Sequence, residues 1–275
     1  MPPGPANSVP MMPREHGAWA MVLTPFAAAL ILAREVTWVS LTALAAVVAV
    51  FALREPLVYL ARERWVWRTP RVDRKIARRS LLCWLLLLAM SAIHLFSTLP
   101  WRFVAGLGAI AGLFTLMSVY MAVRNRQRSV ALQVISVLGL NSSAFAAWLS
   151  VRTDFPAAIW WLWGLLSAHC IAAVLVVHAR LAARAAARTS VAEAARFRRD
   201  ALAAQWLLLA GAAASVATPQ TLAGVPLAFS GAVHLSELKR LSSPAALETP
   251  LRKVGWRAVA VSVTYAVLTL IVLRL

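Results

Sequence analysis

Nine apolar runs, most of them about as long as a membrane-crossing helix, dominate this sequence. A bilayer core takes roughly 20 apolar residues per helix, with a range of about 17–25. The runs cover residues 16–33, 36–53, 80–97, 101–121, 130–150, 156–177, 201–216, 219–233 and 256–273. Because 61% of the residues are hydrophobic and only 14% are charged, the chain has too much apolar surface for a soluble globule. The sequence therefore predicts an all-α polytopic membrane protein with nine transmembrane helices.

The nine runs account for most of the sequence and leave only short segments outside the membrane. We expect residues 13–275 to form a single nine-helix transmembrane domain. Residues 1–12 contain four prolines and precede the first run, so we expect them to form a disordered cytoplasmic tail. In the fourth run, Gly106, Gly108 and Gly112 predict close packing against another helix.

The placement of the basic residues predicts the orientation of the chain. If the N-terminus and the even-numbered loops lie on one side, that side holds 24 of the 28 basic residues and the other side holds 4. Basic loops stay in the cytoplasm, so we expect a cytoplasmic N-terminus and an external C-terminus. The net charge of +18 then serves topology and contact with anionic lipid headgroups. It predicts no nucleic-acid partner, because membrane runs interrupt the basic loops and no recognition module is present.

Proline and small polar residues mark helix boundaries in the loops. Thr69-Pro70 has the pattern of an N-cap followed by proline at the first helical position. Ser190 begins a capping-box pattern that predicts a new helix before the seventh run. Ser243-Pro244 and Pro250 bracket one short helix in the last cytoplasmic loop, and Pro250 also precedes the final run.

The opening of the first run is the most distinctive motif. Residues 13–21 read Pro-Arg-Glu-His-Gly-Ala-Trp-Ala-Met, and an early proline, Pro25, follows within the run. Residues 253–256, Lys-Val-Gly-Trp, precede the last run. Together these stretches resemble the YwiC-like membrane proteins, over the chain from Pro13 to Leu273. The resemblance implies a multi-pass protein of the bacterial cytoplasmic membrane, in a family without a settled biochemical role.

A more distant likeness is topological. Nine spans with major cytoplasmic loops after spans 2 and 6 resemble the plan of the UbiA-type prenyltransferases. In that family, Asp-rich motifs in those loops hold magnesium and a prenyl pyrophosphate, because magnesium prefers oxygen ligands. Here Glu55, Tyr59 and Glu63 share one helix face if Pro56 permits a helix, but no Asp-rich motif is present. We therefore expect no metal site and no cofactor on a degenerate scaffold of this type, and leave enzymatic activity open.

Three histidines stand at the predicted cytoplasmic ends of their runs. His16 opens the first, while His178 and His234 follow the sixth and eighth. These residues predict a binding site at one cytoplasmic mouth, rimmed by His16, Arg54, Glu55, Arg62, His178 and His234. The alternative interpretation is that these are ordinary interfacial side chains, because polar groups that reach water at this depth cost little free energy. The rim favours a small-molecule or lipid ligand, such as an isoprenoid, and the alternative function is a membrane transporter or a structural membrane partner.

His169 lies within the sixth run beside Cys170, with Ser167 nearby. Polar groups at that depth usually face the interior of a helix bundle. If their helices are adjacent, His94 and His169 could ligate a haem. Asn141 in the fifth run predicts interhelical hydrogen bonding.

Overall fold

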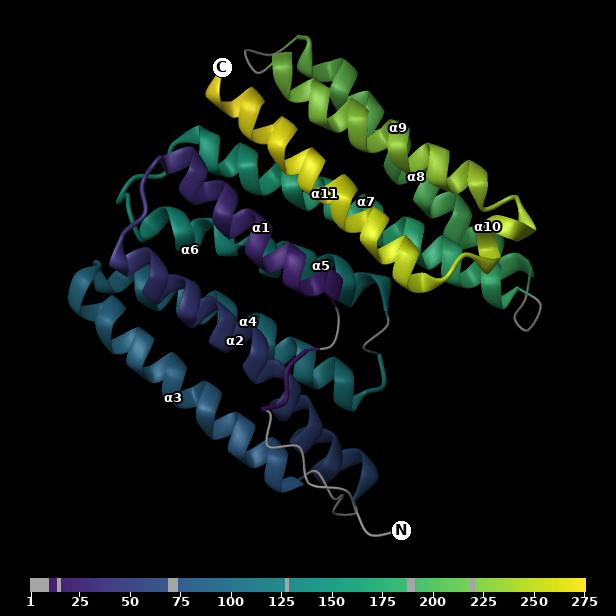
Figure 1. Cartoon of the computed structure of the whole chain (residues 1–275). Coiled ribbons are helices and arrows are strands. Elements are labelled where there is room, and N and C mark those ends of the chain that lie inside the picture. The colour runs from purple at the N-terminus through teal and green to yellow at the C-terminus, as the bar shows by residue number, and fades with distance from the viewer. Residues whose placement is uncertain (1–9, 14–15, 69–73, 127–128, 187–190, 218–220) are drawn as a thin grey trace. The chain divides into compact units, whose positions relative to one another are not determined.

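The protein is described by a computed structural model of residues 1–275, of which all but 1–9, 14–15, 69–73, 127–128, 187–190 and 218–220 are described (Figure 1). Every element in the described part of the chain is a helix. The α-helices are α1 His16–Ala33, α2 Trp38–Arg62, α3 Arg74–Thr98, α4 Trp101–Val123, α5 Val130–Asn141, α6 Ser143–Leu149, α7 Ala157–Ala185, α8 Val191–Ser215, α9 Gly224–Arg240, α10 Pro244–Glu248 and α11 Leu251–Arg274. Two short elements, the π-helix η1 Glu63–Trp67 and the 3-10 helix η2 Thr221–Ala223, complete the order. The predicted all-helical class is confirmed.

Six of the described helical segments are long and apolar enough to cross a membrane. They are Trp38–Trp67, Arg74–Thr98, Trp101–Val123, Val130–Leu149, Ala157–Ala185 and Lys253–Arg274. Gly17–Ala33 is apolar but shorter. The first half of α8 carries charged side chains, and α9 has only 17 residues and ends in a charged turn. The structure therefore describes a multi-pass membrane protein, and the count of nine crossings stays a prediction.

Each of the nine predicted runs overlaps a described helix, although residues 219–220 of the eighth run lie outside the described residues. One of the runs is interrupted. The run at 130–150 breaks at Ser142, where α5 ends and α6 begins. The hydroxyl of Ser143 donates to the backbone oxygen of Val22 in α1, at 2.7 Å. The Asn141 side chain contacts the Ser167 hydroxyl in α7 at 3.2 Å, as the predicted interhelical bonding requires. Polar side chains therefore tie this break to two other helices.

By its contacts the chain divides into two compact units, which we describe separately. Unit 1 comprises Met1–Glu15, Val36–Gly139 and Leu149–Arg152, and unit 2 comprises His16–Glu35, Leu140–Trp148 and Thr153–Leu275. The single domain predicted for residues 13–275 stays a prediction. Of the predicted disordered tail, residues 1–9 lie outside the described residues. The backbone of Met11 bonds to Ser80 and to Trp84 of α3 within unit 1.

Unit 1 is built on α2, which packs against α3 and α4. Thr37 caps α2 through a capping box in which the Thr37 and Ser40 side chains each accept from the other residue's backbone. Pro56 lies inside α2 without ending it. Glu55 and Tyr59 therefore lie on one helix, as expected from the sequence if Pro56 permits a helix. The helical path continues into η1 and ends at Arg68, whose φ of 56° is left-handed.

Unit 2 is built around α7, which packs against α1, α8, α9 and α11 (Figure 1). Small and aliphatic residues fill its core, including a cluster of Val176, Ala179, Ala201, Leu238 and Leu241. Ser243 and Pro250 flank α10, so the short helix predicted in the last loop is confirmed. The predicted helix starts at Thr69-Pro70 and Ser190 lie outside the described residues.

Candidate functional site

The residues of the predicted rim belong to both units. Arg54, Glu55 and Arg62 lie in unit 1, while His178 and His234 lie in unit 2. His16 is the first residue of α1, and its side chain lies outside the described part of the chain. The structure thus describes the two groups separately, and their convergence at one mouth stays a prediction.

The unit 1 residues hold one another through arginine contacts. Nε of Arg54 donates to the Ser118 hydroxyl of α4 at 2.6 Å, and its Nη1 lies 3.7 Å from Oε1 of Glu55. Arg62 donates to Oδ1 of Asn125 at 3.0 Å and places its guanidinium over the Trp67 ring, 5.2 Å from the centroid. These contacts fix the ends of α2 and α4 next to each other.

The acidic side chains of α2 and η1 also have cationic partners. Glu63, buried on η1, pairs with Nε of Arg74 at 3.7 Å. Tyr59 meets the Trp67 ring edge-on, with centroids 5.5 Å apart. In the described ranges no group of three metal-ligating side chains gathers. Of the three residues Glu55, Tyr59 and Glu63, the two carboxylates are therefore paired with arginines and Tyr59 packs on Trp67.

Histidines of unit 2 lie in two different surroundings. His178 stacks on Phe197 of α8, with ring centroids 5.4 Å apart. His234 stacks instead on His169, at 5.2 Å and an interplanar angle of 24°. Tyr265 of α11 also stacks on His169, at 4.3 Å and 13°. His169, His234 and Tyr265, which we call the ring stack, join α7, α9 and α11.

The ring stack is buried among apolar helices and anchored by hydroxyl and carbonyl groups. Nδ1 of His169 lies 2.8 Å from the Ser230 hydroxyl, and Nε2 lies 3.1 Å from that of Ser262. The Tyr265 hydroxyl donates to the backbone oxygen of Leu165 at 2.8 Å. Since both ring nitrogens of His169 face serine hydroxyls, the haem ligation considered from the sequence would require breaking one of these contacts.

One polar atom of the ring stack differs from the others. Nε2 of His234 is buried and has no hydrogen-bond partner among the described residues. His234 as a whole is 8% exposed. An imidazole nitrogen either donates or accepts, depending on the tautomer. This atom is therefore a hydrogen-bonding position on α9 that could serve a ligand.

Sequence reasoning missed most partners of the ring stack. It selected His234 and placed His169 in the bundle interior, but it passed over Ser230, Ser262 and Tyr265. Their spacing carries a signal: positions 230 and 234 are four apart on α9, and 262, 265 and 269 follow one face of α11. A polar stripe at helical spacing inside an apolar run is the pattern that finds them.

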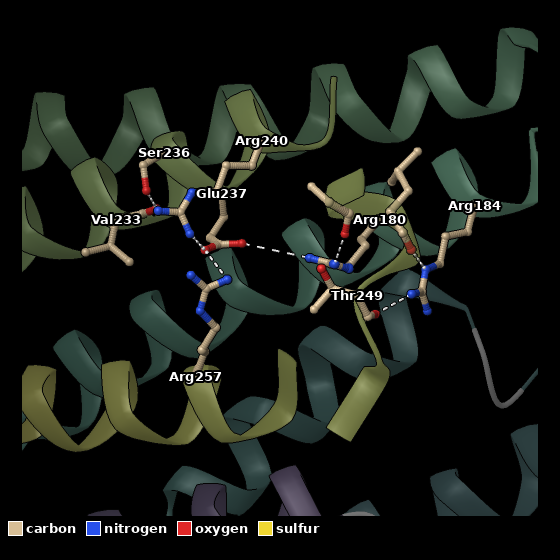
Figure 2. A network of polar contacts seen from close by, with 10 residues as sticks. Arg180, Arg184, Val233, Ser236, Glu237, Arg240, Thr249 and Arg257 are labelled. Atoms are coloured by element: carbon tan, nitrogen blue, oxygen red, sulfur yellow. Dashed lines mark hydrogen bonds and ion pairs between the residues drawn. The ribbon is translucent and has the colours of Figure 1, made fainter. Parts of the chain in front are cut away.

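A second polar group lies at the ends of α7 and α9 and the start of α11 (Figure 2). Here Glu237 of α9 lies among Arg180, Arg240 and Arg257, each with a guanidinium nitrogen 3.2–3.8 Å from a carboxylate oxygen. Arg180 also donates to the backbone oxygen of Ala246 in α10, and Arg184 to those of Leu247 and Thr249. No residue of this group was in the predicted site.

Comparison with known proteins supports the resemblance seen in the opening motif. A family model described as YwiC-like protein matches residues 12–148. No curated protein and no solved structure matches the chain. The match runs from the opening motif through α6, and the ring stack on α7, α9 and α11 follows it along the chain.

Proposed function

Because residues 12–148 place this chain in the YwiC-like family, we propose that it is an integral membrane protein that binds a small molecule or lipid through a polar headgroup. His234 supplies the central contact, by a hydrogen bond to its Nε2. The other rim residues predicted from the sequence, His16, Arg54, Glu55, Arg62 and His178, stay proposed contacts for the same ligand. The orientation with a cytoplasmic N-terminus, in a bacterial cytoplasmic membrane, is part of the proposal and is supported by the distribution of basic residues.

The observation that carries this proposal is the unpartnered Nε2 of His234. A polar group buried without a partner costs roughly 1–3 kcal/mol. Ionisable residues among membrane helices usually mark a functional path or site. Both ring nitrogens of His169 are engaged by Ser230 and Ser262, so within the stack it is Nε2 of His234 that offers a buried position to a hydrogen-bonding ligand. A ligand group there recovers the missing bond.

The ring stack also fixes the direction of that bond. The His169 ring stacks with both His234 and Tyr265. The two hydroxyl contacts hold the His169 ring in place, so the His234 imidazole stacks against a fixed partner on α7. Pre-organisation of this kind lowers the entropy lost on binding.

Native mass spectrometry of the full-length protein released from lipid nanodiscs tests the proposal. His234→Phe keeps an aromatic ring for the stack and removes both nitrogens. We expect the wild-type protein to carry a bound small molecule or lipid at defined stoichiometry, and His234→Phe to lose it. His94→Phe, at an exposed position on α3, is the matched control and should retain the adduct. An adduct equally present in His234→Phe, or absent from the wild-type protein, would overturn the proposal.

A further inference from the structure

We propose that Arg240 and Arg257 form a binding site for a phosphate group, supported by the partly exposed Glu237 and the buried Arg180. This site uses residues other than the ring stack and stands independently of the function proposed above. Its location is the group of Figure 2, where α7, α9 and α11 bring their charged ends together. The favoured ligand is the phosphate of an anionic lipid headgroup.

The charge of the group is the first argument. Four arginines, at 180, 184, 240 and 257, accompany one carboxylate, Glu237. Arg184 is engaged with backbone oxygens, which do not neutralise it. Guanidinium groups remain charged in proteins, so a single carboxylate leaves an excess of positive charge. An anion placed there would relieve the mutual repulsion of these arginines.

The arginines of this group divide into buried and half-exposed side chains. Arg180 is 6% exposed, and its Nε is buried without a hydrogen-bond partner among the described residues. Arg240 and Arg257 have side chains 52% and 55% exposed. Arg180 is thus a buried partner of Glu237, while two half-exposed guanidinium groups keep donors available beside that carboxylate. Arginine forks bind phosphate oxygens with two parallel hydrogen bonds.

The geometry around Glu237 holds the two open arginines together. Nη1 of Arg240 lies 3.2 Å from Oε1 of Glu237, and Nη1 of Arg257 lies 3.6 Å from the same oxygen. Both guanidinium groups therefore converge on one atom, from α9 and from α11. The distance for Arg257 is that of an ion pair rather than a hydrogen bond, so its donors are open to a further acceptor.

The surface of α11 favours a lipid over a free phosphate. Trp256, beside Arg257, is exposed, and so are Val263, Val267 and Ile271 farther along the helix. Their spacing of seven, four and four residues keeps them on one face of α11. A headgroup at Arg257 would therefore have an apolar track for its acyl chains. Free phosphate would use the arginines alone.

Lipid and phosphate titrations of the full-length protein test this site. We would measure binding of phosphatidylglycerol, of phosphatidylcholine and of inorganic phosphate by native mass spectrometry, for wild type and for Arg240→Gln with Arg257→Gln. The matched control is Arg196→Gln with Arg199→Gln, an exposed pair on α8 that removes the same charge. Circular dichroism and thermal unfolding confirm that each variant is folded.

We expect phosphatidylglycerol affinity to fall at least about tenfold in the Arg240 and Arg257 variant, and less than about twofold in the control. Arg257→Gln alone, at a half-exposed position, should give part of the loss. Preference for phosphatidylglycerol over inorganic phosphate identifies a lipid source, whereas equal or tighter binding of inorganic phosphate to the same arginines identifies free phosphate. Unchanged binding in the variant, or an equal loss in the control, would overturn the site.

Discussion

Unit 1 and unit 2 are both built from apolar helices, yet they place their large side chains differently. On α3 and α4 of unit 1, residues such as Met90, Ile93 and Leu116 are exposed. On α7 of unit 2, Ile159 and Leu162 are completely buried. Unit 1 therefore presents much of its apolar surface outward, as helices facing lipid do, whereas unit 2 has a packed interior.

Polar groups follow the same division. In unit 1 the arginines of α2 bond to Ser118 and Asn125 from side chains that are partly exposed. In unit 2 the ring stack lies inside the bundle, where His169 is 1% exposed and Tyr265 is 0% exposed. Unit 1 uses polar residues to join helix ends, and unit 2 uses them to build an interior. This difference is why the central proposed contact, His234, lies in unit 2.

The largest expected effect is the labelling of two loop positions from opposite sides of the membrane. Arg126→Cys in unit 1 and Thr153→Cys in unit 2, each in a Cys83→Ser, Cys170→Ala background, should label from opposite sides. The basic loops predict that an impermeant thiol reagent reaches position 126 only after permeabilisation and position 153 in intact cells. The cysteine-free parent is the blank. Labelling of both positions from one side would contradict the orientation.

A matched pair of leucines tests the difference in packing. Leu162 of α7 is 0% exposed and Leu116 of α4 is 71% exposed. Leu162→Ala should lower the free energy of unfolding by about 2–5 kcal/mol, because it opens a cavity in a packed interior. Leu116→Ala should change it by about 0.5 kcal/mol or less. Thermal and denaturant unfolding in the same detergent measures both, and equal losses would contradict the comparison.

The helices were predictable because their signal is local. Apolar runs of sufficient length place a helix on each of the nine predicted runs, and proline at 244 and 250 placed the short helix between them. The break at Ser142 was not predicted, because no proline marks it and Gly139, three residues earlier, lies within α5. It is held by contacts of Asn141 and Ser143 with α7 and α1, which are distant in the sequence.

The candidate site was only partly predictable, for a related reason. His169 and His234 stand out because imidazoles are rare in apolar runs, but nothing local says that α11 supplies Tyr265 and Ser262 to the same stack. The arginines around Glu237 were counted as topology signals, since charge in a loop is usually solvated. Their grouping on one carboxylate depends on three helix ends meeting.

The glycines of α4 give a further contrast with unit 2. The sequence predicts that Gly106, Gly108 and Gly112 pack closely on another helix. A Cβ added at any of them meets nothing within 4 Å among the described residues, so no helix of unit 1 packs closely on these glycines. At Gly224 of α9, an added Cβ would lie 2.7 Å from the backbone oxygen of Ala212.

Alanine at these positions should have a smaller effect than Leu162→Ala, and the effect should differ in sign between the units. Gly224→Ala should lower the free energy of unfolding by roughly 1–3 kcal/mol, because the backbone oxygen of Ala212 cannot move aside as a side chain can. Gly108→Ala, in the open face of α4, should raise it by about 0.5–1 kcal/mol, since alanine loses less backbone entropy in a helix than glycine. Unfolding in detergent compares the two variants with wild type. A destabilising Gly108→Ala would contradict the assignment of this face to lipid, because close packing through glycine requires a second helix against it.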